Sequence, residues 1–479
     1  MTENMQQFVN HLQDYPEKLD AVIRKGHFSE IFKSFSRDRA NQQAARCAQC
    51  GIPFCQIHCP VSNNIPDWLM AVANNRLEDA WQLLNETNSL PEICGRICPQ
   101  DRLCEGNCVI EQSGHGAVTI GSIETYINET AWQKGWIKPI KPQTSTGFHV
   151  AIIGAGPGGL SCAQHLRKNG HQVTIFDRYD RAGGMMIYGI PNFKLDKKVV
   201  MRRVQWLKDS NVDFKLNINV GTDISFEQIL DQFDGVVIAC GAYKARTLST
   251  QPHHAQGVHL ALDYLRASNR KGLGDHIQDF EDGTLNAAGH DVVVVGGGDT
   301  AMDCVRTAIR QQAKSVRCIY RRDQNNMPGS KKEVTHAIEE GVDFKWLYAP
   351  TEIKTNGSNH VELIKIQKMR LSSPDASGRR AVQLSKQKPA MLPASMVLLA
   401  LGFEVEDNAN SLNAPQLNRT RWGTVALKND LGQTNIEKVF AIGDVVRGPS
   451  LVVWAVYDGQ RAADAVHQYL CKKVKSRAA

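Results

Sequence analysis

Cysteine is the residue type whose number and spacing stand out in this sequence. Eight of its thirteen cysteines lie between Cys47 and Cys108, in two segments. The first segment reads C-A-Q-C-G-I-P-F-C-Q-I-H-C-P and the second reads C-G-R-I-C-P-Q-D-R-L-C-E-G-N-C. Iron–sulfur clusters are held by thiolates that converge from short loops, often with a proline after a cysteine, as at Cys59-Pro60 and Cys98-Pro99. The cysteine pattern therefore favours iron–sulfur sites.

Other uses of these thiols remain open at this point. Zinc sites usually show paired C-x2-C units, and only Cys47 and Cys50 have that spacing. A disulfide framework needs an oxidising compartment, and nothing in the sequence indicates export. The spacings also differ from the ferredoxin run C-x2-C-x2-C-x3-C. The match to iron–sulfur proteins therefore lies in the clustering of the cysteines and not in their exact spacing.

A glycine-rich turn, V-A-I-I-G-A-G-P-G-G-L, follows an apolar run and precedes a helical pattern. Gly154, Gly156 and Gly159 fill the positions of a G-x-G-x-x-G motif. The first glycine permits the tight turn, the second lets a pyrophosphate approach the backbone, and the third lets helix and strand pack closely. Asp177 ends the next predicted strand, where an acid can accept a hydrogen bond from an adenosine ribose. The pattern predicts a dinucleotide site.

A second turn, V-V-V-V-G-G-G-D-T-A-M-D, repeats this arrangement further along the chain. Gly296 and Gly298 fill the first two positions, Ala301 fills the third as an allowed variant, and Asp299 lies between them. We expect these residues to form a second dinucleotide site.

The strand predicted after the second turn, S-V-R-C-I-Y, ends in Arg321 and Arg322 instead of an acid. A guanidinium group can pair with phosphate through two hydrogen bonds, which suits the 2′-phosphate of NADPH. The alternative is a solvated charged turn in which Asp323 neutralises one arginine. The sequence favours NADPH over NADH at this site.

A third element, A-I-G-D, places Gly443 and Asp444 at the end of a predicted strand and shortly before a helix expected from about Leu451 to Lys472. A short acid there can bind a flavin's ribityl hydroxyl, and the helix N-terminus favours negative charge on the reduced ring. By itself this dipeptide is only a turn signal.

The elements that must position these residues are of two kinds. Residues 1–146 combine helical apolar spacing with loops and many prolines. After residue 147, strand-like runs such as Q-V-T-I-F-D and D-G-V-V-I-A-C-G alternate with helical patterns. We therefore expect an α/β fold with two Rossmann-like domains and an N-terminal α-helical domain that carries the cysteines.

The composition of the chain argues against a membrane protein and against a nucleic-acid-binding protein. No apolar run approaches the roughly 18 residues of a membrane helix, and the N-terminus lacks the basic-then-apolar pattern of a signal peptide. The net charge of +7 comes from 56 basic and 49 acidic residues, with no basic run interleaved with aromatic residues. We expect neither a membrane nor a nucleic acid as partner, and a cytoplasmic location.

The two turns, the I-A-C-G-A segment between them and the terminal A-I-G-D resemble the two-dinucleotide-binding flavoproteins, whose fold is glutathione-reductase-like. That resemblance implies FAD on the first turn, with Gly184 and the Gly443–Asp444 pair, and the nicotinamide cofactor on the second. Cys162 and Cys304 have no second cysteine at the spacing of a redox pair, which disfavours a disulfide reductase. The expected domains are residues 1–146, helical; 147–285, FAD-binding, first part; 286–403, NADPH-binding; and 404–479, FAD-binding, second part.

The whole chain resembles the small subunits of bacterial NADPH-dependent glutamate synthases, a module shared with the N-terminal half of dihydropyrimidine dehydrogenase. The resemblance rests on L-P-E-I-C-G-R-I-C-P-Q-D-R-L-C-E-G-N-C, G-A-V-T-I-G-S-I-E, Y-G-I-P-N-F-K-L, G-G-G-D-T-A-M-D-C-V-R-T and Y-R-R-D-Q-N-N-M-P-G-S. It implies two 4Fe–4S clusters with crossed ligation. The implied ligands are Cys47, Cys50, Cys55 and Cys108 for one cluster, and Cys59, Cys98, Cys104 and a fourth residue for the other.

The fourth ligand of the second cluster is open. In the dehydrogenase a glutamine supplies it, and the matching position here, in I-G-S-I-E, is Glu124. A carboxylate is a hard ligand for a cluster iron, so Cys94 competes with it. We expect Glu124, because the preceding segment matches the related module without a gap.

The resemblance implies an electron-input subunit that oxidises NADPH through FAD and passes electrons through the clusters to a large subunit carrying FMN, where 2-oxoglutarate and glutamine give glutamate. Hydride transfer between cofactors needs positioning more than acid–base groups, so no catalytic residue is assigned. Lys194 and Glu333 are either polar neighbours of the cofactors or surface residues. Two alternatives stay open: an NADPH dehydrogenase module for another acceptor, such as a pyrimidine reductase or a ferredoxin, and a non-catalytic iron–sulfur redox sensor.

Overall fold

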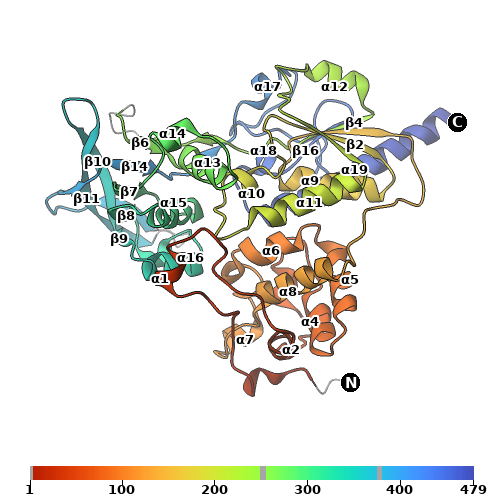
Figure 1. Cartoon of the computed structure of the whole chain (residues 1–479). Helices are drawn as coiled ribbons and strands as arrows, with labels where there is room; N and C mark the ends of the chain where they lie inside the picture. Colours follow the sequence, from red (N-terminus) through yellow and green to blue (C-terminus); the bar gives the residue numbers. More distant parts are fainter. Residues whose placement is uncertain (1–3, 249–254, 375–379, 479) are drawn as a thin grey trace.

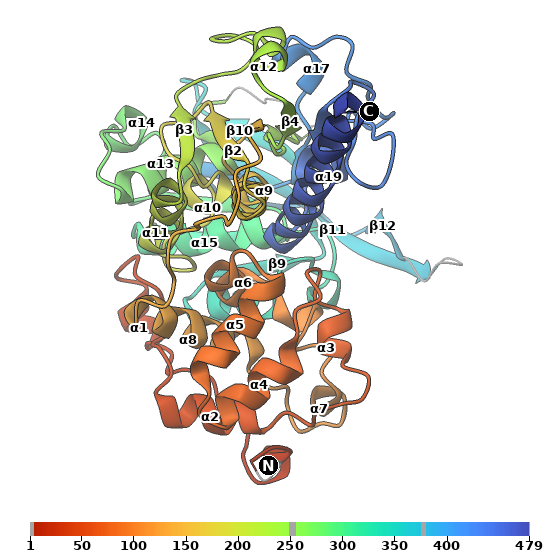
Figure 2. The same cartoon turned by 90° about the vertical axis from the view of Figure 1, so that its right-hand side faces the viewer.

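The computed structural model describes residues 4–248, 255–374 and 380–478 of the chain. A helical N-terminal domain lies beneath two α/β domains that stand side by side (Figure 1). Turned by 90°, the same three parts are seen with the long C-terminal helix running along one α/β domain (Figure 2). The expected fold class is therefore confirmed.

Short and medium-length helices make up the N-terminal domain. They pack around a core that contains Trp68, which is 1% exposed and donates its indole N–H to Asn63 Oδ1 over 2.8 Å. The elements are η1 (Gln7–Val9), α1 (Ala21–Arg24), α2 (Arg37–Ala45), α3 (Phe54–Ile57), α4 (Ile65–Ala73), α5 (Leu77–Thr87), α6 (Pro91–Ile97), η2 (Gln100–Arg102), α7 (Val109–Gln112) and α8 (Ile120–Gln133).

The first α/β domain is built on a parallel five-stranded sheet in the order β16-β4-β1-β2-β3. Its central strands are almost wholly apolar because helices cover both faces of the sheet. The core places α9, α11 and α19 against one face and α12 against the other. The strands are β1 (His149–Ile153), β2 (Gln172–Asp177), β3 (Val212–Leu216), β4 (Gly235–Ile238) and β16 (Val439–Ala441); the helices are α9 (Pro157–Lys168), α10 (Met185–Tyr188), α11 (Lys197–Asp209), α12 (Phe226–Gln232), α17 (Asn408–Ser411), α18 (Asp444–Arg447) and α19 (Val452–Ala478).

The second α/β domain repeats the plan with a parallel sheet in the order β6-β14-β7-β8-β9. Helices cover one face, and a layer of antiparallel strands packs on the other. The parallel strands are β6 (Val258–Leu260), β7 (Asp291–Val295), β8 (Ser315–Tyr320), β9 (Asp343–Trp346) and β14 (Met396–Leu399); the helices are α13 (Ala261–Gly272), α14 (Gln278–Glu281), α15 (Asp299–Arg310), η3 (Gln324–Asn326) and α16 (Lys331–Glu339); the antiparallel strands are β10 (Tyr348–Thr355), β11 (Val361–Pro374), β12 (Arg380–Leu384) and β13 (Ala390–Pro393).

One expected boundary differs from the sheet pairing. The expected first dinucleotide domain runs to residue 285, yet β6 pairs in parallel with β14 of the second sheet and α13 packs on that sheet. A three-residue strand gives no periodic signal, so its partner is set by tertiary packing. The second domain thus begins near Val258. The two α/β domains are also joined by a short antiparallel pair, β5 (Lys244–Ala245) with β15 (Phe403–Glu404).

Within the described part of the chain, none of the helices combines the length and the apolar character that crossing a membrane requires.

Candidate functional site

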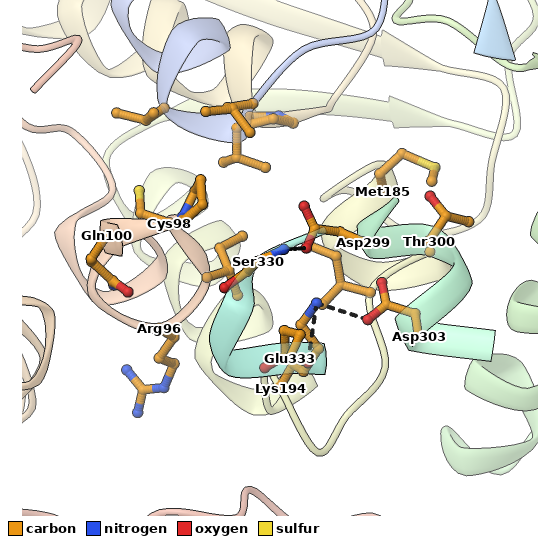
Figure 3. Close-up of a pocket in the computed structure, with 18 of the residues that line it drawn as sticks. Arg96, Cys98, Gln100, Met185, Lys194, Asp299, Thr300, Asp303, Ser330 and Glu333 are labelled. Atoms are coloured by element: carbon orange, nitrogen blue, oxygen red, sulfur yellow. Dashed lines mark hydrogen bonds and ion pairs between the residues drawn. The ribbon is translucent and has the colours of Figure 1, made fainter. Parts of the chain in front are cut away.

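A cavity of about 1040 Å³ lies where the three domains meet. Its wall includes residues of both glycine turns and of the cysteine-bearing domain (Figure 3). In the close-up, Cys98 and Gln100 come from one side of the cavity and Asp299 and Asp303 from the other. Residues of the cysteine domain and of both glycine turns therefore line the same cavity.

The first turn has the geometry that its three glycines predict. Gly154 has φ +115°, and a Cβ there would lie 2.3 Å from the Ala239 carbonyl oxygen. A Cβ on Gly159 would lie 2.0 Å from the Gly154 carbonyl oxygen, so helix and strand leave no room for a side chain. A Cβ on Gly156 would meet nothing within 4 Å. The open side of Gly156 faces the cavity, which suits the approach of a pyrophosphate.

Asp177 lines the cavity, but its carboxylate already has backbone partners. Oδ2 accepts the Ala155 N–H over 2.6 Å, and Oδ1 accepts the Tyr179 N–H over 2.9 Å. Burial raises the pKa of this carboxyl above its ordinary value. Asp177 therefore closes the glycine turn, a role that the sequence motif did not reveal.

The other residues expected at the flavin surround the same turn. Gly184 precedes α10, and a Cβ on it would lie 3.0 Å from the Gly156 Cα. Gly443 and Asp444 line the cavity at the start of α18. The pKa of Asp444 is raised to about 7, chiefly by burial and also by the neighbouring carboxylate of Asp458. The structure brings all the expected FAD-binding residues to one region.

The second turn repeats the backbone geometry of the first. Gly296 has φ +151°, and a Cβ there would lie 2.2 Å from the Ala400 carbonyl oxygen. Gly298 is open on its outer side, whereas Ala301 is fully buried. The turn again leaves its second position free for a close approach.

Arg321 and Arg322 follow β8, beside the second turn. Asp323 accepts hydrogen bonds from the backbone and side-chain nitrogens of Asn326, over 2.9 and 2.7 Å, and so caps η3. Among the residues that the structure describes, no ion pair joins Arg321 or Arg322 to a carboxylate, and the buried Nε of Arg322 has no hydrogen-bond partner. The neutralised charged turn is thus not formed, and the two guanidinium groups remain available to an anion.

Two placements were open for Lys194 and Glu333, beside the cofactors or on the surface, and in the structure both residues line the cavity. Lys194 Nζ lies 2.7 Å from Asp303 Oδ1 and 3.7 Å from Glu333 Oε2 (Figure 3). Burial lowers the pKa of Lys194, but these carboxylates outweigh it and the pKa is raised overall. Sequence reasoning missed Asp303; its place four residues after Asp299 on α15, on the same helix face, was the available signal.

The cysteines separate into two neighbourhoods. The pKa of Cys55 is raised to about 12, chiefly by burial and also by the neighbouring thiols of Cys47, Cys108 and Cys50. Burial likewise raises the pKa of Cys47 to about 11, with Cys108 and Cys50 as neighbours. These four thiols are the set expected for the first cluster.

The second neighbourhood surrounds a small cavity of about 20 Å³. Its lining includes Cys59, Cys94, Cys98, Cys104 and Glu124. Burial raises the pKa of Glu124 to about 8, against a hydrogen bond from Asn88 that lowers it. All the expected ligands of the second cluster, including both candidates for the fourth, therefore border one space.

No group of three or more His, Cys, Asp or Glu side chains in the described ranges is arranged to hold a single metal ion. A four-iron cluster is larger than one ion, so its thiolates surround a volume instead of converging on a point. Two sets of buried and half-buried thiols fit that donor requirement. All thirteen cysteines are free of disulfide bonds.

Family models match both halves of the chain. Residues 24–136 match dihydropyrimidine dehydrogenase domain II, 4Fe-4S cluster. Residues 148–459 match pyridine nucleotide-disulphide oxidoreductase.

The chain is similar to curated proteins over almost its whole length. It is 52% identical over 474 residues to the glutamate synthase NADPH small chain of Azospirillum brasilense, covering 99% of this chain and 98% of that one. It is 42% identical over 473 residues to the glutamate synthase NADPH small chain of Escherichia coli K12, covering 98% and 100%. Among solved structures, Mycobacterium tuberculosis FprA in complex with NADPH matches with a TM-score of 0.58 at 20% identity, over 70% of this chain and 86% of that one, which shows a shared fold.

Proposed function

We propose that this chain, which belongs to the family of NADPH-dependent glutamate synthase small chains, is the electron-input subunit of such an enzyme. It is an NADPH-dependent oxidoreductase with FAD and 4Fe–4S sites, and its partner is a large subunit. We further propose that the large subunit carries FMN and makes glutamate from 2-oxoglutarate and glutamine.

One observation carries the proposal. Cys98 borders both the large cavity beneath the two glycine turns and the small cavity of the second thiol set. When the cofactors are bound, NADPH supplies a hydride to the flavin and the clusters carry electrons singly. Cys98, a predicted cluster ligand, therefore lies next to the cavity that holds the dinucleotide turns. This proximity supports electron transfer from the flavin to the second cluster.

The chain's own residues bind and orient the cofactors. Gly156 and Gly298 leave the backbone accessible to pyrophosphate groups, and the helix N-termini that follow supply N–H donors and a positive dipole end. Arg321 and Arg322 are proposed to hold the 2′-phosphate of NADPH. The ion pair of Lys194 and Asp303 lines the cavity that both turns border. No general base is required, because hydride transfer depends on the relative placement of the two rings.

A surface around the first thiol set supports docking of the large subunit there. Ile52, Phe54, Ile57 and Val109 are 63%, 42%, 59% and 38% exposed and adjoin the predicted ligands of the first cluster. From residue 47 to residue 66 the chain has no Asp, Glu, Lys or Arg, although 22% of all its residues are charged. Interface cores are depleted in charge and rich in apolar side chains. We call these four side chains the α3–α7 patch; both helices lie on the right-hand side of the helical domain in Figure 2.

The experiment measures NADPH oxidation by the anaerobically purified chain, first with a dye acceptor and then with the large chain of its own organism. We expect dye reduction by the chain alone, and glutamate from 2-oxoglutarate and glutamine only when both chains are present. Rapid reduction of a ferredoxin without glutamate formation would assign the chain to another acceptor. A chain replete with FAD and iron that leaves NADPH unoxidised would instead be a redox sensor.

A further inference from the structure

The loop between the predicted ligands Cys98 and Cys104 contacts the second glycine turn across the domain boundary. Arg102 donates from Nη1 to the Pro328 carbonyl oxygen over 2.8 Å and from Nη2 to Asp299 Oδ2 over 3.4 Å. One residue earlier, Asp101 accepts from the Ser330 hydroxyl over 3.4 Å and from the Lys331 N–H over 3.2 Å. The cysteine domain is therefore bonded directly to the loop that flanks the NADPH turn.

Asp299 presents an electrostatic problem at this turn. It is the first residue of α15, directly after Gly298, whose open side is the proposed place of the pyrophosphate. Its Oδ1 accepts the Ser330 N–H over 2.9 Å, which fixes the carboxylate at the mouth of the turn (Figure 3). A carboxylate within a few ångströms of a pyrophosphate repels it, and the repulsion grows where water is partly excluded.

Two cations of the cavity wall near this turn are already held by other carboxylates. Lys194 pairs with Asp303 and Glu333. Arg306 pairs with Glu333 and with the buried Glu340. Among the ion pairs of the described residues, Arg102 is the cation that pairs with Asp299. The side chains of this pair are 43% and 38% exposed, so the ion pair contributes little to folding stability.

We propose that Arg102 is a positioning residue for NADPH, supplied by the iron–sulfur domain. It neutralises Asp299 and so lowers the electrostatic cost of bringing the pyrophosphate to the second turn. Nucleotide affinity then depends on the docking of the cysteine domain against α16. This inference rests on the proposed assignment of the second turn to NADPH.

The test is a double-mutant cycle on NADP⁺ binding, measured by calorimetric titration of the holoprotein at low ionic strength. Arg102→Ala should weaken NADP⁺ binding by about two- to fivefold, which is the size expected for a partly exposed charge, and the loss should shrink in salt. Arg102→Lys keeps the charge and should bind nearly as the native protein does. Asp299→Asn keeps an oxygen for the Ser330 N–H, and added to Arg102→Ala it should restore affinity.

The control is Arg76→Ala, which removes an exposed ion pair with Asp79 in the same domain and should leave NADP⁺ affinity unchanged. FAD and iron contents are measured for every variant, so loss of the fold is seen separately from loss of affinity. The inference is overturned if Arg102→Ala binds NADP⁺ as the native protein does, or if Asp299→Asn fails to restore binding in the double variant. A native protein that does not bind NADP⁺ at all would instead overturn the proposed function.

Discussion

Asn88 donates a hydrogen bond from its side-chain Nδ2 to Oε1 of Glu124 over 2.9 Å. The same amide accepts from the Leu90 N–H over 3.0 Å and lies 3.7 Å from the Cys94 thiol through its Oδ1. Asn88 is 2% exposed, so its orientation is fixed by these partners. It therefore stands between the two side chains that compete to be the fourth ligand of the second cluster.

The fourth ligand can be identified with a pair of variants purified without air. We propose that Glu124 is the ligand, so Glu124→Ala should change the low-temperature EPR spectrum of the reduced protein and lower its iron content. Cys94→Ala should keep the native spectrum, because a buried unligated thiol is common. If Cys94→Ala loses about half of its iron while Glu124→Ala is normal, the assignment is wrong. Full iron in both variants would point to solvent or another residue.

Replacing Arg321 and Arg322 with Ala and Ser should weaken NADPH binding selectively. Both guanidinium groups lack a carboxylate partner among the described residues, so the change removes the proposed charge-assisted bonds to the 2′-phosphate with little effect on folding. The expected loss is about 1.5–3 kcal/mol for each such bond. The Michaelis constants for NADPH and NADH are compared, with NADH as the internal control. Equal losses for both nucleotides would contradict the 2′-phosphate assignment.

Gly156→Val should give a folded protein that lacks FAD. Gly156 has φ −73°, which any residue adopts, and a Cβ there meets nothing within 4 Å, so the added side chain occupies only the space proposed for the pyrophosphate. Flavin absorbance and NADP⁺ binding are measured together, and the second turn should still bind.

Gly154→Val is the matched contrast for that variant. Its Cβ would lie 2.3 Å from the Ala239 carbonyl oxygen at a positive φ, so this change should lower the thermal midpoint as well as the FAD content. A yellow, flavin-replete Gly156→Val protein would show that the first turn is not the FAD site.

A charge placed in the α3–α7 patch should disrupt association with the large subunit. Ile57→Lys puts an ammonium group into an uncharged surface, which penalises burial there on binding. Sedimentation or size-exclusion analysis of the two chains should show at least tenfold weaker association, with dye reduction by the variant unchanged. Leu384→Lys, a charge on a 64% exposed apolar residue of β12, is the control. Equal association of both variants would place the interface elsewhere.

Glu340 should make a pH-dependent contribution to stability. The carboxylate is fully buried and bonded to three guanidinium groups, those of Arg24, Arg306 and Arg310. Burial alone would raise its pKa, but the guanidinium groups of Arg310 and Arg306 outweigh burial and lower the pKa to about 2. Because the folded-state pKa lies below the ordinary value of 4.5, the stabilisation is fully present above that value and is lost as the pH falls toward 2.

The corresponding variant is Glu340→Gln. It removes the negative charge that three buried guanidinium groups share, which leaves Arg310 without its carboxylate partner, and should destabilise the fold by about 3–5 kcal/mol at pH 7. The difference in urea midpoint from the native protein should be largest at neutral pH and should narrow as the pH falls below 4.5. Glu352→Gln, which removes an exposed pair with Lys365, should have little effect at any pH. A difference in urea midpoint that stays constant on acidification would show that Glu340 does not titrate with a lowered pKa.

The sequence by itself determined the features that depend on local geometry. Gly154 and Gly296 stand where the backbone takes a positive φ against a neighbouring carbonyl, and such positions admit almost no other residue. The apolar runs of β1 and β7 are strands buried on both faces, which a short apolar segment beside a glycine turn already indicates. These signals fixed the α/β fold class and the places of both turns.

Only the tertiary structure decided how distant residues share the site. The Arg102–Asp299 pair and the place of Cys98 on two cavities join segments that are far apart in sequence, and no local pattern encodes their contact. Asp177 turned out to be held by two backbone N–H groups, and β6 joined the second sheet. The physical reason is the same in each case. The energy of an ion pair, a hydrogen bond or a strand pairing depends on what packing brings within a few ångströms, and that distance is set by the whole fold.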